Sequence, residues 1–336
     1  MVFVTGGTGL VGSHLICQLL SDGHQVRALC RSDSDKSWFV RTAKWVMGDQ
    51  YESSILRLEW FEGDVTDVIA LSDAIHGCSQ VYHAAAVVSF AKRDQEQLRK
   101  INVAGTSNVV NVCLGSESKP DLCFISSTAS IGGVEKKLVD ESVPYLAESS
   151  NSYYSTTKYS AELEVIRGRE EGLNAVIINP CIVLGFGNWN TGSAKFFKNG
   201  KNGFPFYTGG SNAFVDARDV AKGSVLLMSN QCFDGKYLCT AWNKKFLEVF
   251  QEIALSFGTK PPRFHVSKGL AEFAWRVTSF IRFFTGTGII TKESARAGLK
   301  HMSYSSKRLV DRVNMDFKSF EESIAEISEA YQQMEA

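Results

Sequence analysis

Short apolar runs alternate with segments whose apolar residues recur at helical spacing. Strands that alternate with helices in this way are typical of a parallel sheet with right-handed crossovers. We therefore expect an α/β fold, a doubly wound parallel sheet with a smaller C-terminal substrate-binding lobe. The predicted strands are Met1–Val4, Gln25–Cys30, Leu56–Phe61, Gln80–His83, a run that ends at Phe124–Thr128, and Leu173–Ile178. The predicted helices are His14–Leu20, Val68–Ile75, Gln95–Leu114 and Phe317–Met334, and a further helix opens at Asn151–Lys158.

Other stretches have a weaker pattern. Ser34 to Glu52 shows little periodicity and predicts a variable loop with a short helix. From Asn188 onward the chain predicts loops and short elements, and Pro261–Pro262 divides the last region into two helical parts. Asp67 is a good N-cap for the helix that follows it.

The apolar stretch from Leu270 to Ile290 has a length that could be mistaken for a membrane span. Glu272, Arg276 and Arg282 interrupt it, so we predict no spanning helix. Its aromatic residues predict packing in the core or in a substrate lid. A membrane-surface contact or a subunit contact is the alternative, and a homodimer stays open.

A glycine-rich loop lies between the first strand and the first helix. Gly7, Gly9 and Gly12 fit G-x-G-x-x-G, and Gly6, Gly9 and Gly12 fit G-x-x-G-x-x-G. Strand, glycine loop and helix together predict a dinucleotide pyrophosphate site, because glycine lets backbone amides approach a phosphate at a helix N-terminus. The alternative is an ordinary glycine-rich turn. The residues expected to bind the cofactor here are Gly6, Thr8, Gly9, Leu10 and Val11.

The end of the second strand bears on the choice of cofactor. NAD-binding versions of this motif place an acidic residue about 20 residues past the glycines. This chain has Arg31 and Ser32 there, and a guanidinium suits a 2′-phosphate. Asp33 and Asp35 follow and weaken the argument. We therefore predict NADP, with NAD as the alternative.

Two further strand ends are expected to contact the nucleotide. Asp64 could accept a hydrogen bond from the adenine amino group, with Val65 against the ring. Ala84, Ala85 and Ala86 are small enough to let a flat cofactor lie against the backbone. His83 could act as a catalytic base, but we favour a histidine fixed by packing and a backbone hydrogen bond.

Tyr154 and Lys158 are four residues apart and share one face of the predicted helix. A lysine cation would lower the pKa of the phenol, which could then exchange a proton with a carbonyl oxygen. Ser127, one of three consecutive hydroxyl residues at the end of the fifth strand, would bond the same oxygen. Lys158 could also bond the nicotinamide ribose. Asn102, inside a helix, is expected to bond a specific partner.

Composition narrows the classes of function. Lys plus Arg and Asp plus Glu both number 36 among 336 residues, which gives no support for a nucleic-acid partner. None of the eight cysteines forms a C-x-x-C pair, so buried reduced thiols are favoured over zinc or disulfides, and no metal is expected. The first residues enter a strand directly, which leaves no room for a signal peptide. We predict a cytoplasmic protein.

The motifs together resemble the extended short-chain dehydrogenases/reductases from Val2 to about Met228. Asn179–Gly185 and Gly209–Asp216 look like the dihydroflavonol-4-reductase and 3β-hydroxysteroid dehydrogenase branch, and the match to nucleotide-sugar epimerases is poorer. The motifs that carry the resemblance are Thr5–Gly12, Asp64–Val65, His83–Ala86, Asn102–Thr106, Ser126–Ser127, Tyr154–Lys158, Asn179–Pro180 and Phe214–Ala221.

The resemblance implies an NAD(P)-binding Rossmann domain over residues 1–180. Residues 181–336 would be mostly the substrate-binding lobe, with some segments that return to the Rossmann domain. Ser127, Tyr154 and Lys158 would be catalytic and Asn102 a structural or proton-relay support. Thr128 is an alternative to Ser127, because Gly132 and Gly133 leave the register ambiguous.

The resemblance also implies that Pro180, Ile182 and Val183 lie near the nicotinamide carboxamide. One departure is Phe186, where related sequences often have proline, and it bears on the shape of the substrate loop. Candidates for a mostly apolar substrate pocket are Asn190, Phe206, Tyr207, Phe214 and Trp242. Each of them could equally be a core residue.

The main hypothesis is an NADP-dependent oxidoreductase that reduces a ketone or aldehyde of a moderately apolar small molecule. A nucleotide-sugar epimerase or dehydratase that retains its cofactor is the first alternative. A non-catalytic dinucleotide-sensing protein is the second, and the intact Ser127, Tyr154 and Lys158 set argues against it.

Overall fold

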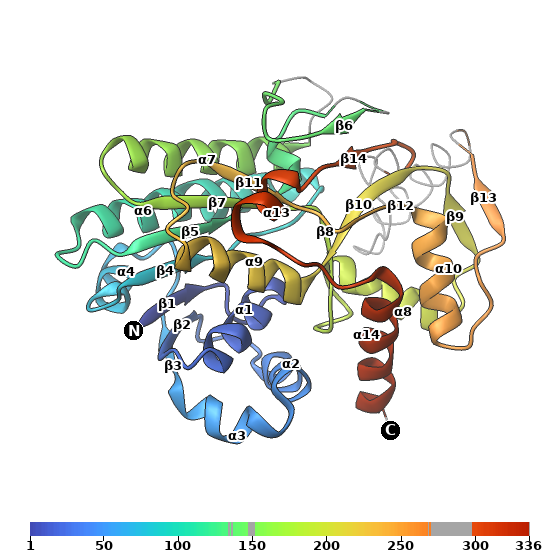
Figure 1. Ribbon diagram of the computed structural model, residues 1–336, viewed down its shortest axis with the longest axis horizontal. Coiled ribbons are helices and arrows are strands. Elements are labelled where there is room, and N and C mark those ends of the chain that lie inside the picture. Colours follow the sequence, from blue (N-terminus) through green and yellow to red (C-terminus); the bar gives the residue numbers. More distant parts are fainter. Residues whose placement is uncertain (134, 136, 147–151, 268, 270–297, 336) are drawn as a thin grey trace.

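A seven-stranded sheet forms the centre of the computed structural model (Figure 1). Every strand pairs in parallel with its neighbours, in the order β3-β2-β1-β4-β5-β7-β11. The strands are β1 (Val2–Thr5), β2 (Val26–Cys30), β3 (Leu58–Glu62), β4 (Gln80–His83), β5 (Asp121–Ile125), β7 (Ala175–Pro180) and β11 (Lys236–Cys239). The structure describes residues 1–133, 135, 137–146, 152–267, 269 and 298–335.

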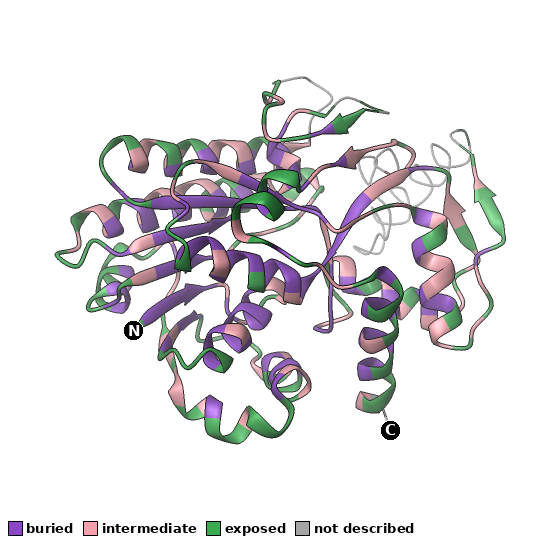
Figure 2. Cartoon of the chain, in the orientation of Figure 1, coloured by how far each residue is buried: buried purple, intermediate pink, exposed green. Residues whose placement is uncertain are grey.

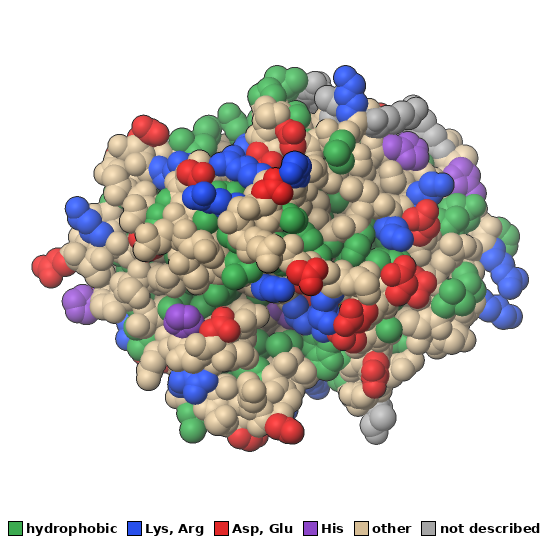
Figure 3. Space-filling view, in the orientation of Figure 1, with side chains coloured by type: hydrophobic (Ala, Val, Ile, Leu, Met, Phe, Trp, Pro, Cys, Tyr) green, Lys and Arg blue, Asp and Glu red, His purple; other side chains and the backbone are tan. Residues whose placement is uncertain are grey.

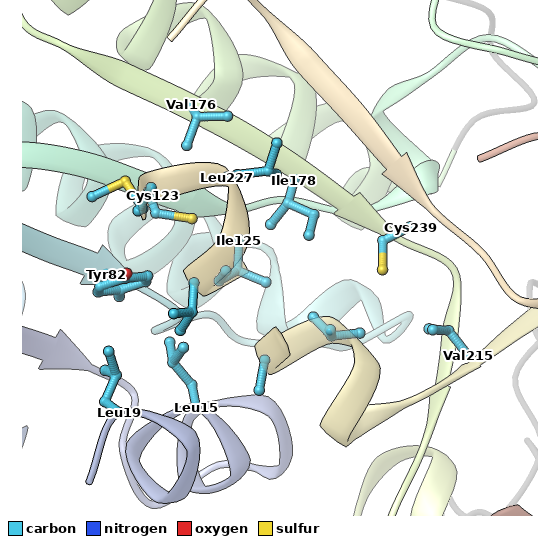
Figure 4. Packing of buried hydrophobic residues seen from close by; sticks show 14 of the residues in the cluster. Leu15, Leu19, Tyr82, Cys123, Ile125, Val176, Ile178, Val215, Leu227 and Cys239 are labelled. Atoms are coloured by element: carbon cyan, nitrogen blue, oxygen red, sulfur yellow. The ribbon is translucent and has the colours of Figure 1, made fainter. Parts of the chain in front are cut away.

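Helices cover both faces of this sheet, because alternate residues of a strand point to opposite sides. Val2 and Val4 belong to one core cluster and Phe3, between them, to another. The first cluster includes Leu15 and Leu19 of α1 and Leu227 of α9, and Figure 4 shows these side chains beside the strands. The flanking helices are α1 (Leu10–Ser21), α2 (Ser37–Met47) and α9 (Ala217–Ser229) on that face, and α4 (Val68–Ile75), α6 (Gly105–Gly115) and α7 (Tyr153–Glu170) on the other. The predicted doubly wound sheet is confirmed.

The segment predicted as a variable loop with a short helix is mostly helical, so a helix is present as expected but the loop was overestimated. Phe39, Thr42, Ala43 and Met47 are the buried residues of α2, and their spacing places them on one face of the helix. Apolar residues that are not fully buried, such as Val40 and Trp45, lie between them and hide this stripe in the sequence. The helix is followed by η1 (Gly48–Gln50), α3 (Tyr51–Ser54) and η2 (Ile55–Arg57), so β3 begins two residues later than predicted.

The long helix predicted over Gln95–Leu114 is present but is not uniform. A π-helical segment, η4 (Arg99–Ala104), lies between α5 (Gln95–Leu98) and α6, and η3 (Lys92–Asp94) precedes them. Asn102 lies within the π-helical segment. Such segments are frequent at functional sites because they redirect a side chain.

Smaller sheets lie beside the central one. β12 (Trp242–Lys245), β10 (Ser211–Asp216) and β8 (Ile182–Leu184) form a three-stranded sheet. β13 (Phe264–Val266) pairs with β9 (Phe206–Thr208), and β14 (Ser303–Tyr304) pairs with β6 (Leu138–Val139). The remaining elements are η5 (Thr128–Ser130), η6 (Gly192–Ala194), α8 (Lys195–Lys201), α10 (Phe246–Ser256), α13 (Lys307–Val313) and α14 (Phe320–Glu335). The division of the chain at residue 180 stays a prediction.

The last helix, α14, packs on the loop that follows β8. The Tyr331 hydroxyl donates to the carbonyl oxygen of Gly187 at 2.8 Å and accepts from its amide at 3.0 Å. The Tyr331 ring stacks on Trp189, with ring centroids 4.8 Å apart. Phe186 is 2% exposed and also packs on Tyr331, with centroids 4.7 Å apart. The phenylalanine that departs from the family pattern is therefore a core residue that anchors this loop.

Burial and charge follow the usual division of a globular domain. Figure 2 shows the inner strands buried and the outer faces of the helices exposed. Acidic and basic side chains are interspersed on the face shown in Figure 3. All eight cysteines are buried and unpaired. The described residues include no helix with the length and apolar character needed to cross a membrane, and the stretch Leu270–Ile290 lies outside them.

Candidate active site

The glycine loop is folded so tightly that two of its positions exclude any side chain. Gly6 has a φ of +71°, and a Cβ there would lie 2.7 Å from the carbonyl carbon of Ala84. A Cβ on Gly12 would lie 2.1 Å from the carbonyl oxygen of Gly6. Gly9 precedes α1 in extended conformation, and no side chain caps this end of the helix. The loop and the helix N-terminus therefore form a backbone cradle that fits a pyrophosphate.

The other residues predicted to bind the cofactor at this loop lie at the start of α1. Thr8 is half-buried and Gly9 is exposed, and Leu10 and Val11 are half-buried in the first turn. A Cβ on Gly187 would come within 3.0 Å of the Leu10 side chain, so the loop that α14 holds lies against the cradle.

Hydroxyl groups fix His83 at the end of β4. Its Nδ1 lies 2.7 Å from Thr5 Oγ1, and its Nε2 lies 3.0 Å from Thr106 Oγ1. Burial, with a smaller effect from the cation of Lys158, lowers the pKa of His83 to about 3. A histidine held neutral with both nitrogens engaged is a structural residue, as favoured from the sequence. Its partners are two hydroxyls rather than the backbone group we expected.

The neutral state of His83 makes stability depend on pH. Its folded pKa of about 3 lies below the ordinary value of 6.5, so between these values the unfolded chain takes up a proton that the folded protein does not. Stability is therefore lost as the pH falls below 6.5. We expect H83Q to flatten the slope of unfolding free energy against pH, by at most about 1.4 kcal/mol per pH unit.

Urea unfolding at several pH values measures this slope. H76Q, which removes an exposed histidine, is the matched control and should keep the wild-type slope. A slope in H83Q equal to that of the wild type would contradict the assignment.

Tyr154 lies near the start of α7, where Ser152 caps the helix by accepting a hydrogen bond from the Ser155 amide at 3.0 Å. The Tyr154 phenol hydrogen-bonds with the Ser127 side chain. Its ring packs edge-on against Phe90, with centroids 5.9 Å apart. The helix thus brings the phenol to the strand end that carries Ser127, as predicted from the sequence.

The pKa of Tyr154 is raised, whereas the sequence argument expected Lys158 to lower it. Burial of the phenol raises its pKa, and the hydrogen bond with Ser127 opposes this only in part. The ammonium of Lys158 instead donates to the Ile125 carbonyl oxygen at 2.8 Å and lies 4.4 Å from the centre of the Phe124 ring. The phenol therefore stays protonated at neutral pH, which suits a proton donor.

Lys158 is 2% exposed, an unusual place for a lysine. Burial lowers its pKa to about 7, and the carboxylate of Glu162 acts in the opposite direction. The lysine can therefore change its charge near neutral pH.

The two candidate hydroxyls at the end of β5 have different partners. Ser127 faces Tyr154, and its Oγ also accepts from the Ala129 amide at 3.1 Å. The Thr128 side chain hydrogen-bonds with the phenol of Tyr304. This geometry favours Ser127 as the hydroxyl that acts with Tyr154.

Asn102 has the specific partners that the sequence argument expected. Its Oδ1 accepts from the Val87 amide at 2.8 Å, and its Nδ2 donates to the Val87 carbonyl at 3.0 Å and to Thr157 Oγ1 at 3.1 Å. It therefore ties the segment after β4 to α7, one residue before Lys158.

The residues predicted to distinguish the nucleotide lie at the ends of β2 and β3. Arg31 is exposed, and its Nε lies 3.1 Å from a carboxylate oxygen of Asp33. Asp64 accepts from the amide and the hydroxyl of Thr66. Val65 is 4% exposed and packs in the core near Gly105.

The remaining predicted cofactor contacts lie at two further strand ends. Ala84 and Ala85 are half-buried and Ala86 is exposed, directly after β4. Pro180 is the buried last residue of β7, and Ile182 and Val183 are half-buried in β8.

The predicted substrate-pocket residues do not share one environment. Phe214 is fully buried in a core cluster, which fits the core alternative. Trp242 donates to the Lys318 carbonyl at 3.0 Å and packs on Phe320. Asn190 and Phe206 are exposed and Tyr207 is half-buried. Within the described residues no group of His, Cys, Asp and Glu could hold a metal ion.

The sequence analysis missed Glu162, a buried carboxylate on the same face of α7 as Tyr154 and Lys158. The spacing of four residues between Tyr154 and Lys158 continues to Glu162, and that repeat was the available signal. It also missed Tyr331, which no local pattern connects to the loop after β8.

The chain matches a known protein family and resembles known reductases. The model of the NAD dependent epimerase/dehydratase family matches residues 2–238. A protein of Synechocystis sp. named "Putative dihydroflavonol 4-reductase" is 27% identical, and the match covers 96% of this chain and 92% of the relative. Cinnamoyl-CoA reductase 1 of Petunia hybrida is 30% identical over 71% of this chain and 72% of its own length.

A solved structure has the same fold. The crystal structure of gox2253 aligns with a TM-score of 0.81 at 26% identity and covers 99% of this chain and 98% of its own.

Proposed function

Because the chain belongs to the NAD dependent epimerase/dehydratase family, we propose that it is an NADPH-dependent reductase of a ketone or aldehyde on a moderately apolar small molecule. The family and its reductase relatives make it an NAD(P)-dependent oxidoreductase. The preference for NADPH and the kind of substrate are our proposals. The observation that carries the reductase itself is the Tyr154 phenol, kept protonated beside the Ser127 hydroxyl. The preference for NADPH rests on Arg31 at the end of β2.

The names of the relatives support the substrate class. Dihydroflavonol 4-reductase and cinnamoyl-CoA reductase are named for compounds that carry a carbonyl on an aromatic skeleton, a ketone in the first and a CoA thioester in the second, and the aromatic part is apolar in both. We extend that chemical class, and no particular compound, to this chain.

The residues of this chain fit a dinucleotide. The cradle of Gly6, Gly9 and Gly12 would hold the pyrophosphate, and Arg31 would reach a 2′-phosphate. Thr8, Leu10, Val11, Asp64, Val65, Ala84, Ala85, Ala86, Pro180, Ile182 and Val183 are the further proposed contacts. When bound, the reduced nicotinamide supplies the hydride.

The side chains supply the proton. We propose that Ser127 donates a hydrogen bond to the substrate carbonyl oxygen and that Tyr154 gives that oxygen its phenol proton. Lys158, on the same helix face, then provides positive charge near the phenolate. The raised pKa of Tyr154 supports reduction, since the group that must give up a proton starts with one.

Turnover of a panel of ketones and aldehydes, followed by the absorbance of NADPH, tests the proposal directly. Mass spectrometry of molecules that co-purify with the protein complements it. NADPH consumption with a carbonyl supports a reductase. Turnover of nucleotide sugars by a retained dinucleotide would instead indicate an epimerase or dehydratase. Dinucleotide binding with no turnover of either class would indicate a sensor.

We expect R31A to weaken NADPH binding by about 10–100-fold, because a charge-assisted hydrogen bond contributes about 1.5–3 kcal/mol. Binding of NADH, which lacks the 2′-phosphate, should change little. Titration calorimetry with both nucleotides measures this, and R99A, at another exposed ion pair, is the matched control. Equal losses for NADPH and NADH would remove Arg31 from the 2′-phosphate.

A further inference from the structure

Four polar groups from β7, β11 and the segment that follows β5 converge on one buried carboxylate. Glu162 is 1% exposed, although glutamate is rarely buried without partners. Its Oε1 accepts from Ser126 Oγ at 2.6 Å, from Asn179 Nδ2 at 2.5 Å and from Ser130 Oγ. Its Oε2 lies 3.8 Å from the ammonium of Lys236 on β11. The proposed catalytic step uses none of these five residues.

We propose that Glu162 is a positioning residue that fixes the backbone at Ser127 and maintains the positive charge of Lys158. This inference rests on the proposed reductase function. It concerns a residue that touches neither substrate nor cofactor in that proposal.

The first part follows from the hydrogen bonds around Ser127. The Ser127 carbonyl oxygen accepts from Ser130 Oγ at 2.6 Å and from Asn179 Nδ2 at 3.1 Å. Asn179 Nδ2 has two hydrogens and also bonds Glu162, and the single Ser130 hydroxyl proton lies within reach of both the Ser127 carbonyl and Glu162. The carboxylate therefore holds the two groups that hold the Ser127 peptide, and Ser127 presents its hydroxyl to Tyr154 from that peptide.

The second part follows from the charges around Lys158. Glu162 is one helical turn along α7 from Lys158, and Tyr154 is one turn in the other direction. β5 contributes the Ile125 carbonyl and the Phe124 ring, and β4 contributes His83, which is held neutral. Glu162 is thus the anionic group that acts on Lys158. Burial lowers the pKa of Lys158, Glu162 opposes this, and the pKa that results from both effects is about 7.

Because Lys236 lies beside Glu162, two substitutions should shift the pKa of Lys158 in opposite directions. E162Q keeps the shape of the side chain and removes its charge, so the pKa of Lys158 should fall. K236Q removes the other cation beside Glu162, so the pKa of Lys158 should rise. Lys236 is partly exposed, so this variant does not depend on tolerance of a change in the core. E164Q, at a half-buried glutamate of α7 that contacts Ser107 of α6, is the matched control.

The experiment measures kcat against pH with NADPH and a carbonyl substrate. It also measures the titration of Lys158 by NMR of isotopically labelled lysine, assigned with K158M. We expect the alkaline limb of the profile and the lysine titration to move down by about one pH unit in E162Q and up in K236Q, with no shift in E164Q. A wild type without turnover would count against the reductase, while the lysine titration would still decide the role of Glu162.

Two results would overturn the proposal. One is an E162Q protein that melts at a lower temperature but keeps the wild-type titration of Lys158, which would make Glu162 a packing residue. The other is an unchanged titration in K236Q, which decides the question even where E162Q does not fold.

Discussion

We expect Y154F to reduce kcat for carbonyl reduction by about 10²–10⁴-fold, the usual contribution of a positioned proton donor. Phenylalanine keeps the ring that packs on Phe90 and removes only the hydroxyl that Ser127 bonds. Dinucleotide affinity should therefore stay close to that of the wild type. Steady-state kinetics and NADPH titration on the same preparation separate these two quantities.

Y153F is a matched control, since Tyr153 is the adjacent tyrosine on α7. It removes a phenol from the same helical turn but not from the proposed site, and it should keep wild-type turnover. Undiminished turnover in Y154F would exclude this phenol as the acid. An equal loss in both variants would point to damage at the start of α7 instead.

G12A should abolish measurable dinucleotide binding. The added Cβ would lie 2.1 Å from the Gly6 carbonyl oxygen, and backbone on both sides leaves no flexible side chain to move away. The loop must open, which destroys the cradle, and overpacking of this kind costs about 1–3 kcal/mol of stability. Titration with NADPH and urea unfolding measure the two effects.

Gly115, the last residue of α6, is the control position, because a Cβ there meets no atom within 4 Å. G115A should bind dinucleotide like the wild type and should be at least as stable, since alanine favours helix. Dinucleotide binding in G12A that equals the wild type would refute the cradle.

Sequence patterns predicted the features whose signals lie within a few neighbouring residues of the chain. β4 has the predicted bounds, and Asp67 caps α4 by accepting from two amides of its first turn. The spacing of Tyr154 and Lys158 placed them on one helix face because an α-helix has a fixed period. The segment after β2 was misjudged because apolar residues that are not fully buried, Val40, Trp45 and Val46, lie between its four buried residues and blur their helical spacing.

Properties that depend on distant residues could not be predicted in this way. The pKa of Tyr154 depends on how deeply the folded chain buries it, and a sequence pattern gives the sign of a neighbouring charge but not the burial. Phe214 looked like a pocket residue because aromatic residues serve both roles, and only packing assigned it to the core. The partners of Glu162 come from β7, β11 and the segment that follows β5, so no window of sequence shows them together.

The positions of β1 and α14 give the chain a mechanical asymmetry. β1 pairs with strands on both of its sides, whereas α14 packs against the outside of the fold. Tension applied before β1 must shear two ladders of hydrogen bonds at once, and it dismantles the glycine loop with them. Tension applied beyond α14 first peels Tyr331 away from the loop after β8 and leaves the sheet in place. An ATP-driven unfoldase that pulls ahead of β1 would therefore destroy the phosphate-binding turn early. One that pulls beyond α14 would destroy it late.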